Sequence, residues 1–68
     1  MSELSHTIRL LTRLERALVR VNLGAPFSGP IERRANFVLR RIGAGGSVSL
    51  ENPSTVRRAI RMIENYGG

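Results

Sequence analysis

The sequence contains no cysteine, and His6 is its only histidine. Disulfide bonds and zinc sites of ordinary composition are therefore excluded. A chain of 68 residues buries only about 60% of its unfolded surface, and such domains are usually stabilised by disulfides, metals or self-association. We therefore expect one helical domain over residues 1–68 that forms a homodimer and holds no metal or cofactor.

The chain also has little that could carry out catalysis. It lacks aspartate, and its five glutamates are scattered, whereas acid–base catalysis needs a closely placed pair. His6 has only Glu3 nearby to orient it, and there is no cysteine nucleophile. The run Gly43–Ser47 lacks the lysine of a phosphate-binding loop and follows a helical segment, so we interpret it as an interhelical loop. We therefore expect that the protein is not an enzyme.

Long hydrophobic runs are absent as well. No stretch approaches the roughly 18 apolar residues that a transmembrane helix needs. The first residues also lack the basic region and apolar run of a signal peptide, so we expect a cytoplasmic protein. The segment from Leu4 to Val21 has the pattern of a basic amphipathic helix, which can lie on an anionic membrane. Because the domain is otherwise short of core residues, we expect this segment in the core and no membrane partner.

Apolar residues recur at helical spacing in three segments of the chain, about 3–23, 30–42 and 53–66. Each segment carries arginines on the face opposite its apolar stripe. The sequence therefore predicts an all-α compact bundle of three short amphipathic helices. The expected core consists of Leu4, Ile8, Leu10, Leu11, Leu14, Ala17, Leu18, Val21, Phe27, Ile31, Ala35, Val38, Ile42, Val56, Ala59, Ile60, Ile63 and Tyr66, with Leu39 and Met62 at its edge.

Several residues predict where these helices begin and how they are joined. Ser2 or Ser5 and Asn52 are suitable N-caps of the first and third helices, and Pro30 suits the first helical position of the second. The alternating run Ser47–Leu50 is short and lies between glycines and a proline, so we expect an extended loop rather than a sheet.

Glu15 is a carboxylate on the apolar side of the first predicted helix. Such a group is seldom buried without a partner. We therefore expect either an edge position or a salt bridge to an arginine of a neighbouring helix.

Arginine carries all of the positive charge, and the formal net charge is +6. This excess indicates a polyanionic partner, either nucleic acid or an acidic protein surface. Arg9, Arg13, Arg16 and Arg20 fall within an arc of about 60° on a helix. Guanidinium groups bind phosphate bidentately, so this stripe is a candidate for nucleic-acid backbone contact. The alternative is a solvated helix face whose arginine stems cover apolar surface.

Arginines also surround Phe37, which lies away from the apolar stripe of the second helix with Arg33 and Arg41 one turn to either side. An exposed aromatic in this setting can stack on a base of single-stranded nucleic acid or anchor a protein–protein contact. Phe37 can equally be a core residue of a helix that is buried on two sides. We favour packing or self-association, and assign Arg33, Phe37 and Arg41 as a candidate protein interface.

The third segment contains the run Ser-Thr-Val-Arg-Arg-Ala within Asn52–Glu64. This run resembles the opening of the recognition helix of helix-turn-helix and winged-helix regulators. The resemblance covers about a fifth of the chain, and the link from Gly43 to Asn52 is longer than the turn of about 3–4 residues in that motif. It implies that Val56, Ala59 and Ile60 hold the helix to the core. It also implies a DNA-facing set of Ser54, Thr55, Arg57, Arg58 and Arg61.

These observations predict a small arginine-rich nucleic-acid-binding protein, a DNA-binding regulator that uses phosphate contacts and its C-terminal helix for readout. DNA is favoured over RNA as the partner. The alternative is a non-enzymatic protein–protein interaction module, an adaptor or an inhibitor of a partner machine, of the kind that mobile elements encode.

Overall fold

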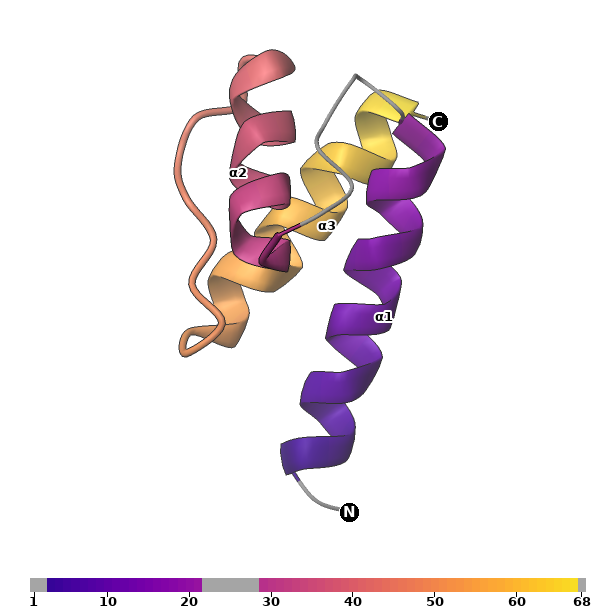
Figure 1. The fold of residues 1–68 in the computed structure, drawn as a ribbon, viewed down its shortest axis with the longest axis vertical. Coiled ribbons are helices and arrows are strands. Elements are labelled where there is room, and N and C mark those ends of the chain that lie inside the picture. The colour runs from indigo at the N-terminus through magenta and orange to yellow at the C-terminus, as the bar shows by residue number, and fades with distance from the viewer. Residues whose placement is uncertain (1–2, 22–28, 68) are drawn as a thin grey trace.

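The structure is a computed structural model that describes residues 3–21 and 29–67. These residues form α1 (Glu3–Val21), α2 (Ile31–Arg41) and α3 (Pro53–Gly67), as Figure 1 shows. The described part of the chain contains no strand, and residues 47–50 form a loop. The predicted all-α fold of three helices is therefore confirmed.

The helices α1 and α3 run in the same general direction and pack against one another (Figure 1). Their side chains meet at matching steps of seven residues, because His6 contacts Arg57 and Arg13 contacts Glu64. Seven residues are close to two helical turns, so each helix keeps one face toward the other.

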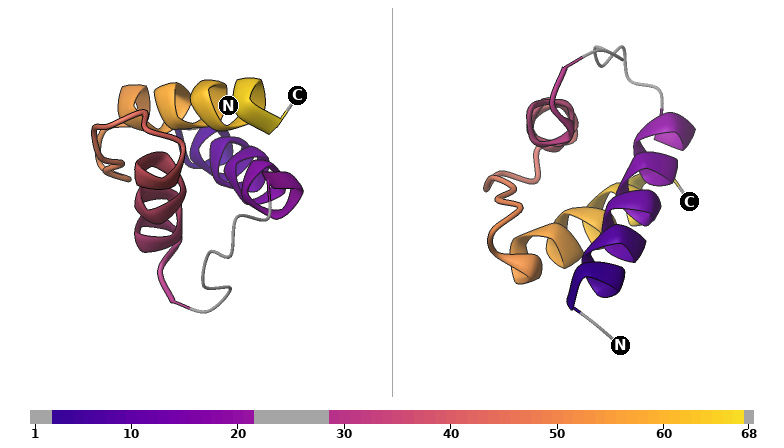
Figure 2. Two further views of the ribbon diagram at one scale, coloured as in Figure 1. Left: turned by 90° about the horizontal axis from the view of Figure 1, so that it is seen from above. Right: turned by 60° about the horizontal axis from the view of Figure 1, so that its bottom comes forward.

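Helix α2 lies steeply across this pair. The right-hand view of Figure 2 shows α2 nearly end-on, while α1 and α3 are seen from the side. All three helices and one loop residue, Val48, contribute to a single core. Its buried members are Leu14, Ala17, Leu18, Ala35, Val38, Leu39, Val48, Val56, Ala59, Ile60 and Ile63. None of the three helices, over the residues described, is long and apolar enough to cross a membrane.

Two residues assigned to the core are in fact more than half exposed, Ile8 and Tyr66. Ile8 lies about 120° around α1 from the fully buried Leu14, which places it outside the face that meets α3 and α2. Tyr66 is in the last turn of α3, where exposure keeps its hydroxyl in water. The core predictions for Leu4 and Phe27 fall outside the described side chains.

The predicted starts of the helices are partly correct. Asn52 caps α3 as expected, because its Oδ1 accepts a hydrogen bond from the Ser54 amide at 3.2 Å. The prediction for Pro30 is wrong by one position, since its backbone is extended and it precedes the first helical residue of α2. Ser5 lies inside α1 and is not its N-cap, and Ser2 is not among the described residues.

Glycine ends α2 in a Schellman motif. The Gly43 amide donates to the Arg40 carbonyl at 3.2 Å, and the Ala44 amide donates to the Leu39 carbonyl at 2.9 Å. Gly43 has a φ of 75°, a left-handed conformation that is cheap only for glycine. The glycine run therefore stops the helix and turns the chain back toward the start of α3, as the pink-to-orange trace in Figure 1 shows.

Side chains hold the loop of residues 48–50 in place. Its three successive amides donate to Asn36 Oδ1 at 2.7 Å, Thr55 Oγ1 at 2.9 Å and Glu32 Oε2 at 2.9 Å. These bonds replace the strand partners that the loop lacks, and they let Val48 enter the core. The loop is thereby fixed to both α2 and α3.

Candidate functional site

Two open hollows of about 350 Å³ each lie between α1 and α3. They share Arg13 and Glu64 and together form one surface, which we call the α1–α3 groove. Its floor includes the apolar residues Ala17, Ile60 and Ile63. The ionisable residues that line it are His6, Arg13, Arg16, Arg20, Arg57, Arg61 and Glu64.

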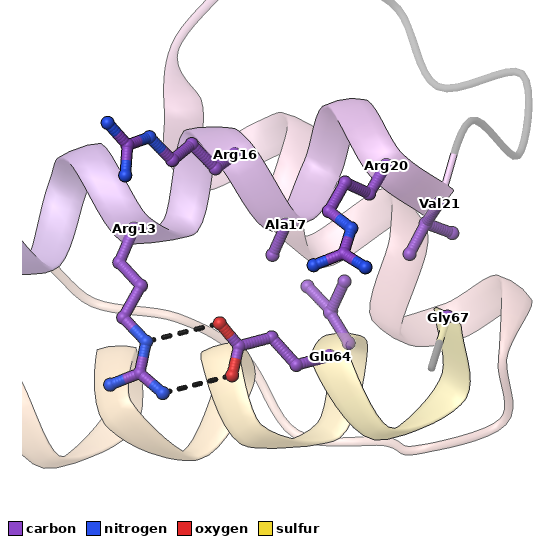
Figure 3. Close-up of a pocket in the computed structure, with 8 residues that line it drawn as sticks. Arg13, Arg16, Ala17, Arg20, Val21, Glu64 and Gly67 are labelled. Carbon is purple, nitrogen blue, oxygen red and sulfur yellow. Dashed lines mark hydrogen bonds and ion pairs between the residues drawn. The ribbon is translucent and has the colours of Figure 1, made fainter.

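A bidentate ion pair between Arg13 and Glu64 crosses the middle of the groove (Figure 3). Arg13 donates from Nε to Oε2 at 3.1 Å and from Nη2 to Oε1 at 3.0 Å. The hydrogen bonds from Arg13 hold the pKa of Glu64 below its usual range, and the charge of Arg20 acts in the same direction. Glu64 is therefore ionised at neutral pH.

The other α1 arginines of the groove are oriented differently. In Figure 3, Arg20 extends from α1 toward the gap beside Glu64, whereas Arg16 extends along α1 and away from it. Both side chains are exposed, and Arg9 is exposed on the same stripe one turn before Arg13. Residues 9, 16 and 20 therefore present guanidinium groups to solvent along one edge of the groove.

The α3 side of the groove adds Arg57 and Arg61, both exposed. Arg57 Nη2 lies 2.9 Å from His6 Nε2, within hydrogen-bond distance of that ring nitrogen. This contact directs Arg57 toward α1. Arginines from the first and third helices thus converge on one surface.

Arg58 has a different position from its neighbour Arg57. Its guanidinium donates to the carbonyls of Gly45 at 3.2 Å and Ala44 at 3.1 Å. A Cβ on Gly46 would lie 2.7 Å from Arg58 Nη1, so glycine at that position makes room for the guanidinium. Arg58 therefore ties α3 to the preceding loop and lies outside the groove.

The side chains of Ser54 and Thr55 form hydrogen bonds with residues of the loop that precedes α3. Ser54 Oγ donates to Asn52 Oδ1 at 2.7 Å, and its side chain is exposed. Thr55 Oγ1 lies within hydrogen-bond distance of the Ser49 carbonyl and the Asn52 carbonyl, and it accepts from the Ser49 amide. Of the five residues that the recognition-helix resemblance assigns to DNA, the structure brings Arg57 and Arg61 to the groove.

Glu15, which the sequence places on the apolar side of α1, forms an ion pair with Arg34 of α2. Arg34 donates to Glu15 from Nη1 at 2.8 Å and from Nη2 at 2.7 Å, which confirms the expected salt bridge. Glu15 follows Arg13 by two residues, or about 200° around the helix, so it lies opposite the groove. The hydrogen bonds from Arg34 hold the pKa of Glu15 below its ordinary value.

The Glu15–Arg34 ion pair makes the free energy of unfolding depend on pH in the acidic range. The folded protein lowers the pKa of Glu15 below its ordinary value of 4.5. As the pH falls toward that value, Glu15 is therefore protonated in the unfolded chain before it is protonated in the folded protein. The stabilisation is present well above pH 4.5 and is lost as the pH falls below it. Because the Glu15 side chain is 45% exposed and solvent screens part of the pair, we expect Glu15→Gln to lower the free energy of unfolding at neutral pH by only about 0.5 kcal/mol and to flatten its decline between about pH 5 and pH 3. Urea unfolding at a series of pH values measures both effects.

Glu51→Gln provides the matched control for this measurement. Glu51 is exposed, and the described residues offer it no ion pair. Its variant should keep the acid sensitivity of the unaltered protein. Equal acid profiles for Glu15→Gln and the unaltered protein would contradict a stabilising role of the Glu15–Arg34 pair.

The candidate protein interface on α2 is arranged around a half-buried ring. Phe37 packs against the core, which corresponds to the packing alternative of the sequence analysis. Arg33 and Arg41 are exposed to either side of it. They belong to α2 and do not line the α1–α3 groove.

The structure thus brings together parts of two predicted sites that lie far apart in the sequence. These are the arginine stripe of α1 and the residues of α3 that the recognition-helix resemblance assigns to DNA. Glu64 and His6 also belong to this surface, and no pattern in the sequence assigns either of them to a binding site. Arg13 and Glu64 are 51 residues apart in the sequence, and so are His6 and Arg57. Their proximity can be recognised only when the direction and register of α1 against α3 are known.

Comparisons with protein-family models, curated proteins and solved structures find no match to this chain.

Proposed function

We propose that this protein binds nucleic acid through the α1–α3 groove, as a small DNA-binding regulator without catalytic activity. The observation that carries the proposal is the convergence of arginines from α1 and α3 on one surface that contains a single described carboxylate, Glu64. Guanidinium groups placed along an edge suit the repeating phosphates of a nucleic-acid backbone.

The distribution of acidic residues supports the same partner. Glu15 pairs with Arg34 on the opposite side of α1, and Glu32 is bound to the amide of Leu50. These carboxylates do not line the groove, so Glu64 is the one described carboxylate within it that lowers the positive potential there. Five of the eleven arginines line the groove, where a polyanion can reach them.

A role in base recognition is proposed for the exposed part of α3. Arg61 and Ser54 are exposed on this helix, and arginine is the commonest reader of guanine edges in the major groove. Backbone contacts from α1 would then fix the orientation of the protein, and α3 would supply sequence preference.

Binding measured by fluorescence anisotropy tests this function. We expect about micromolar or tighter binding to duplex DNA at low salt, with weaker binding to single-stranded DNA and RNA. If Arg9, Arg16, Arg20 and Arg61 each contact one phosphate, the slope of log K against log salt should be about −3 to −4. Absence of binding at low salt, or binding insensitive to salt, would contradict the proposal and favour a module that binds an acidic protein surface.

A homodimer is also part of the proposal. Ile8 and Val19 are both more than half exposed, and eleven residues return to within about 20° on a helix, so they lie on one line of α1. Covering this line with a second copy would bury apolar surface that the monomer leaves in water. Sedimentation velocity at several protein concentrations tests it, and a monomer at all of them would rule it out.

A further inference from the structure

We propose that Glu64 is a built-in competitor for phosphate, whose carboxylate occupies an anion-binding position formed by Arg13 in the α1–α3 groove. The inference rests on the proposed nucleic-acid binding and adds its regulation. Removing the carboxylate should therefore strengthen binding, although the variant loses a salt bridge.

The geometry of the pair carries this inference. Two parallel hydrogen bonds of 3.0 and 3.1 Å from one guanidinium to two oxygens are the arrangement that arginine also offers to phosphate. While Glu64 holds Arg13, that guanidinium cannot make the same bidentate contact with a phosphate.

The position of Glu64 makes the competition effective. It lines both hollows of the groove, and Figure 3 shows Arg20 extending toward the gap beside it. A phosphate approaching Arg20 therefore meets a negative charge close to its path, and like charges at short range repel.

A purely structural role accounts less well for the pair. The side chain of Arg13 is 62% exposed and that of Glu64 is 36% exposed. Ion pairs this exposed add little to stability, because solvent screens them and two long side chains lose freedom. The helices α1 and α3 are held together by the apolar residues beneath, among them the fully buried Leu14 and Ile63.

The experiment compares Glu64→Gln with Glu51→Gln in anisotropy titrations against one duplex DNA over a range of salt. Both variants raise the net charge from +6 to +7, but only Glu64 lies in the groove. We expect Glu64→Gln to bind about fivefold more tightly at low salt, with a slope steeper by about one because Arg13 gains a phosphate. Glu51→Gln should change the affinity less than about twofold.

Arg13→Gln supplies the second comparison. If Glu64 acts mainly by occupying Arg13, Glu64→Gln should give a clearly smaller gain in the Arg13→Gln background, where only its repulsion near Arg20 remains. An equal gain in both backgrounds would show general repulsion and overturn the competitor role, as would equal affinities of Glu64→Gln and Glu51→Gln. Circular dichroism and thermal melts of each variant establish that the fold is kept.

The outcomes also separate this inference from the proposed function. Salt-dependent binding by the unaltered protein, with no advantage for Glu64→Gln, would leave nucleic-acid binding in place and remove only the competitor. Binding by Glu64→Gln alone would support a strong competitor. Failure of all variants to bind would overturn both.

Discussion

Leu14→Ala is expected to lower the free energy of unfolding by about 3 kcal/mol. Leu14 is fully buried and is among the largest side chains of the core without exposed surface. Its truncation removes apolar contacts and leaves a cavity that the surrounding helices fill only in part. A domain of this length has a total stability of only about 3–10 kcal/mol, so the variant should be close to unfolding. In circular dichroism melts, the midpoint should fall by about 15 °C.

Ile8→Ala is the control on the same helix. Ile8 is 55% exposed in the single chain, so at protein concentrations too low for self-association its truncation should change the free energy of unfolding by less than about 0.5 kcal/mol. Equal losses for the two variants would contradict the way α1 packs. A loss that appears for Ile8→Ala only at higher protein concentration would instead indicate that the proposed homodimer buries this face.

The second large effect is expected in binding. The double variant Arg20→Gln, Arg61→Gln removes one guanidinium from each side of the α1–α3 groove. Each lost phosphate contact costs close to tenfold in affinity at about 100 mM salt, through the counterions that it would have released. We therefore expect duplex DNA to bind about 50-fold more weakly, with a salt slope reduced by about two.

Arg33→Gln with Arg41→Gln is the matched control, because it also lowers the net charge from +6 to +4. Both side chains are exposed on α2, outside the groove. This variant should weaken binding by less than about threefold. If both double variants lose affinity equally, net charge rather than the groove governs binding.

A stronger loss from the α2 pair would have a different meaning. It would move the binding surface to the arginines beside Phe37, where the sequence predicts a protein interface. That ring is half-buried against the core, so it offers little free surface for a base to stack on.

Much of the fold follows from local sequence patterns. Apolar spacing places α1, α2 and α3 close to their observed bounds, because the period of about 3.6 residues is a property of each segment alone. The end of α2 at Gly43 and the cap of α3 at Asn52 are local as well, since each depends on a few neighbouring residues. The exposure of Ile8 was not predictable in this way, because it depends on which sector of α1 the other helices cover.

The loop between α2 and α3 could be predicted from the sequence only in part. Its alternating residues 47–50 indicate an extended backbone, and the structure shows such a loop without a sheet. The burial of Val48 depends on Asn36, Glu32 and Thr55, which bind the loop amides from two different helices. No local pattern contains that information.

The sequence by itself determined the three helices, the arginine stripe of α1 and the net charge, because periodicity and composition are local quantities. Only the tertiary structure decided that part of this stripe lines one groove with Arg57 and Arg61 and that Glu64 lies in the middle of it. It also separated Arg57 from Arg58, which turns to the loop carbonyls. The physical reason is that α1 and α3 pack in one direction and one register, and this depends on core contacts among residues far apart in the chain.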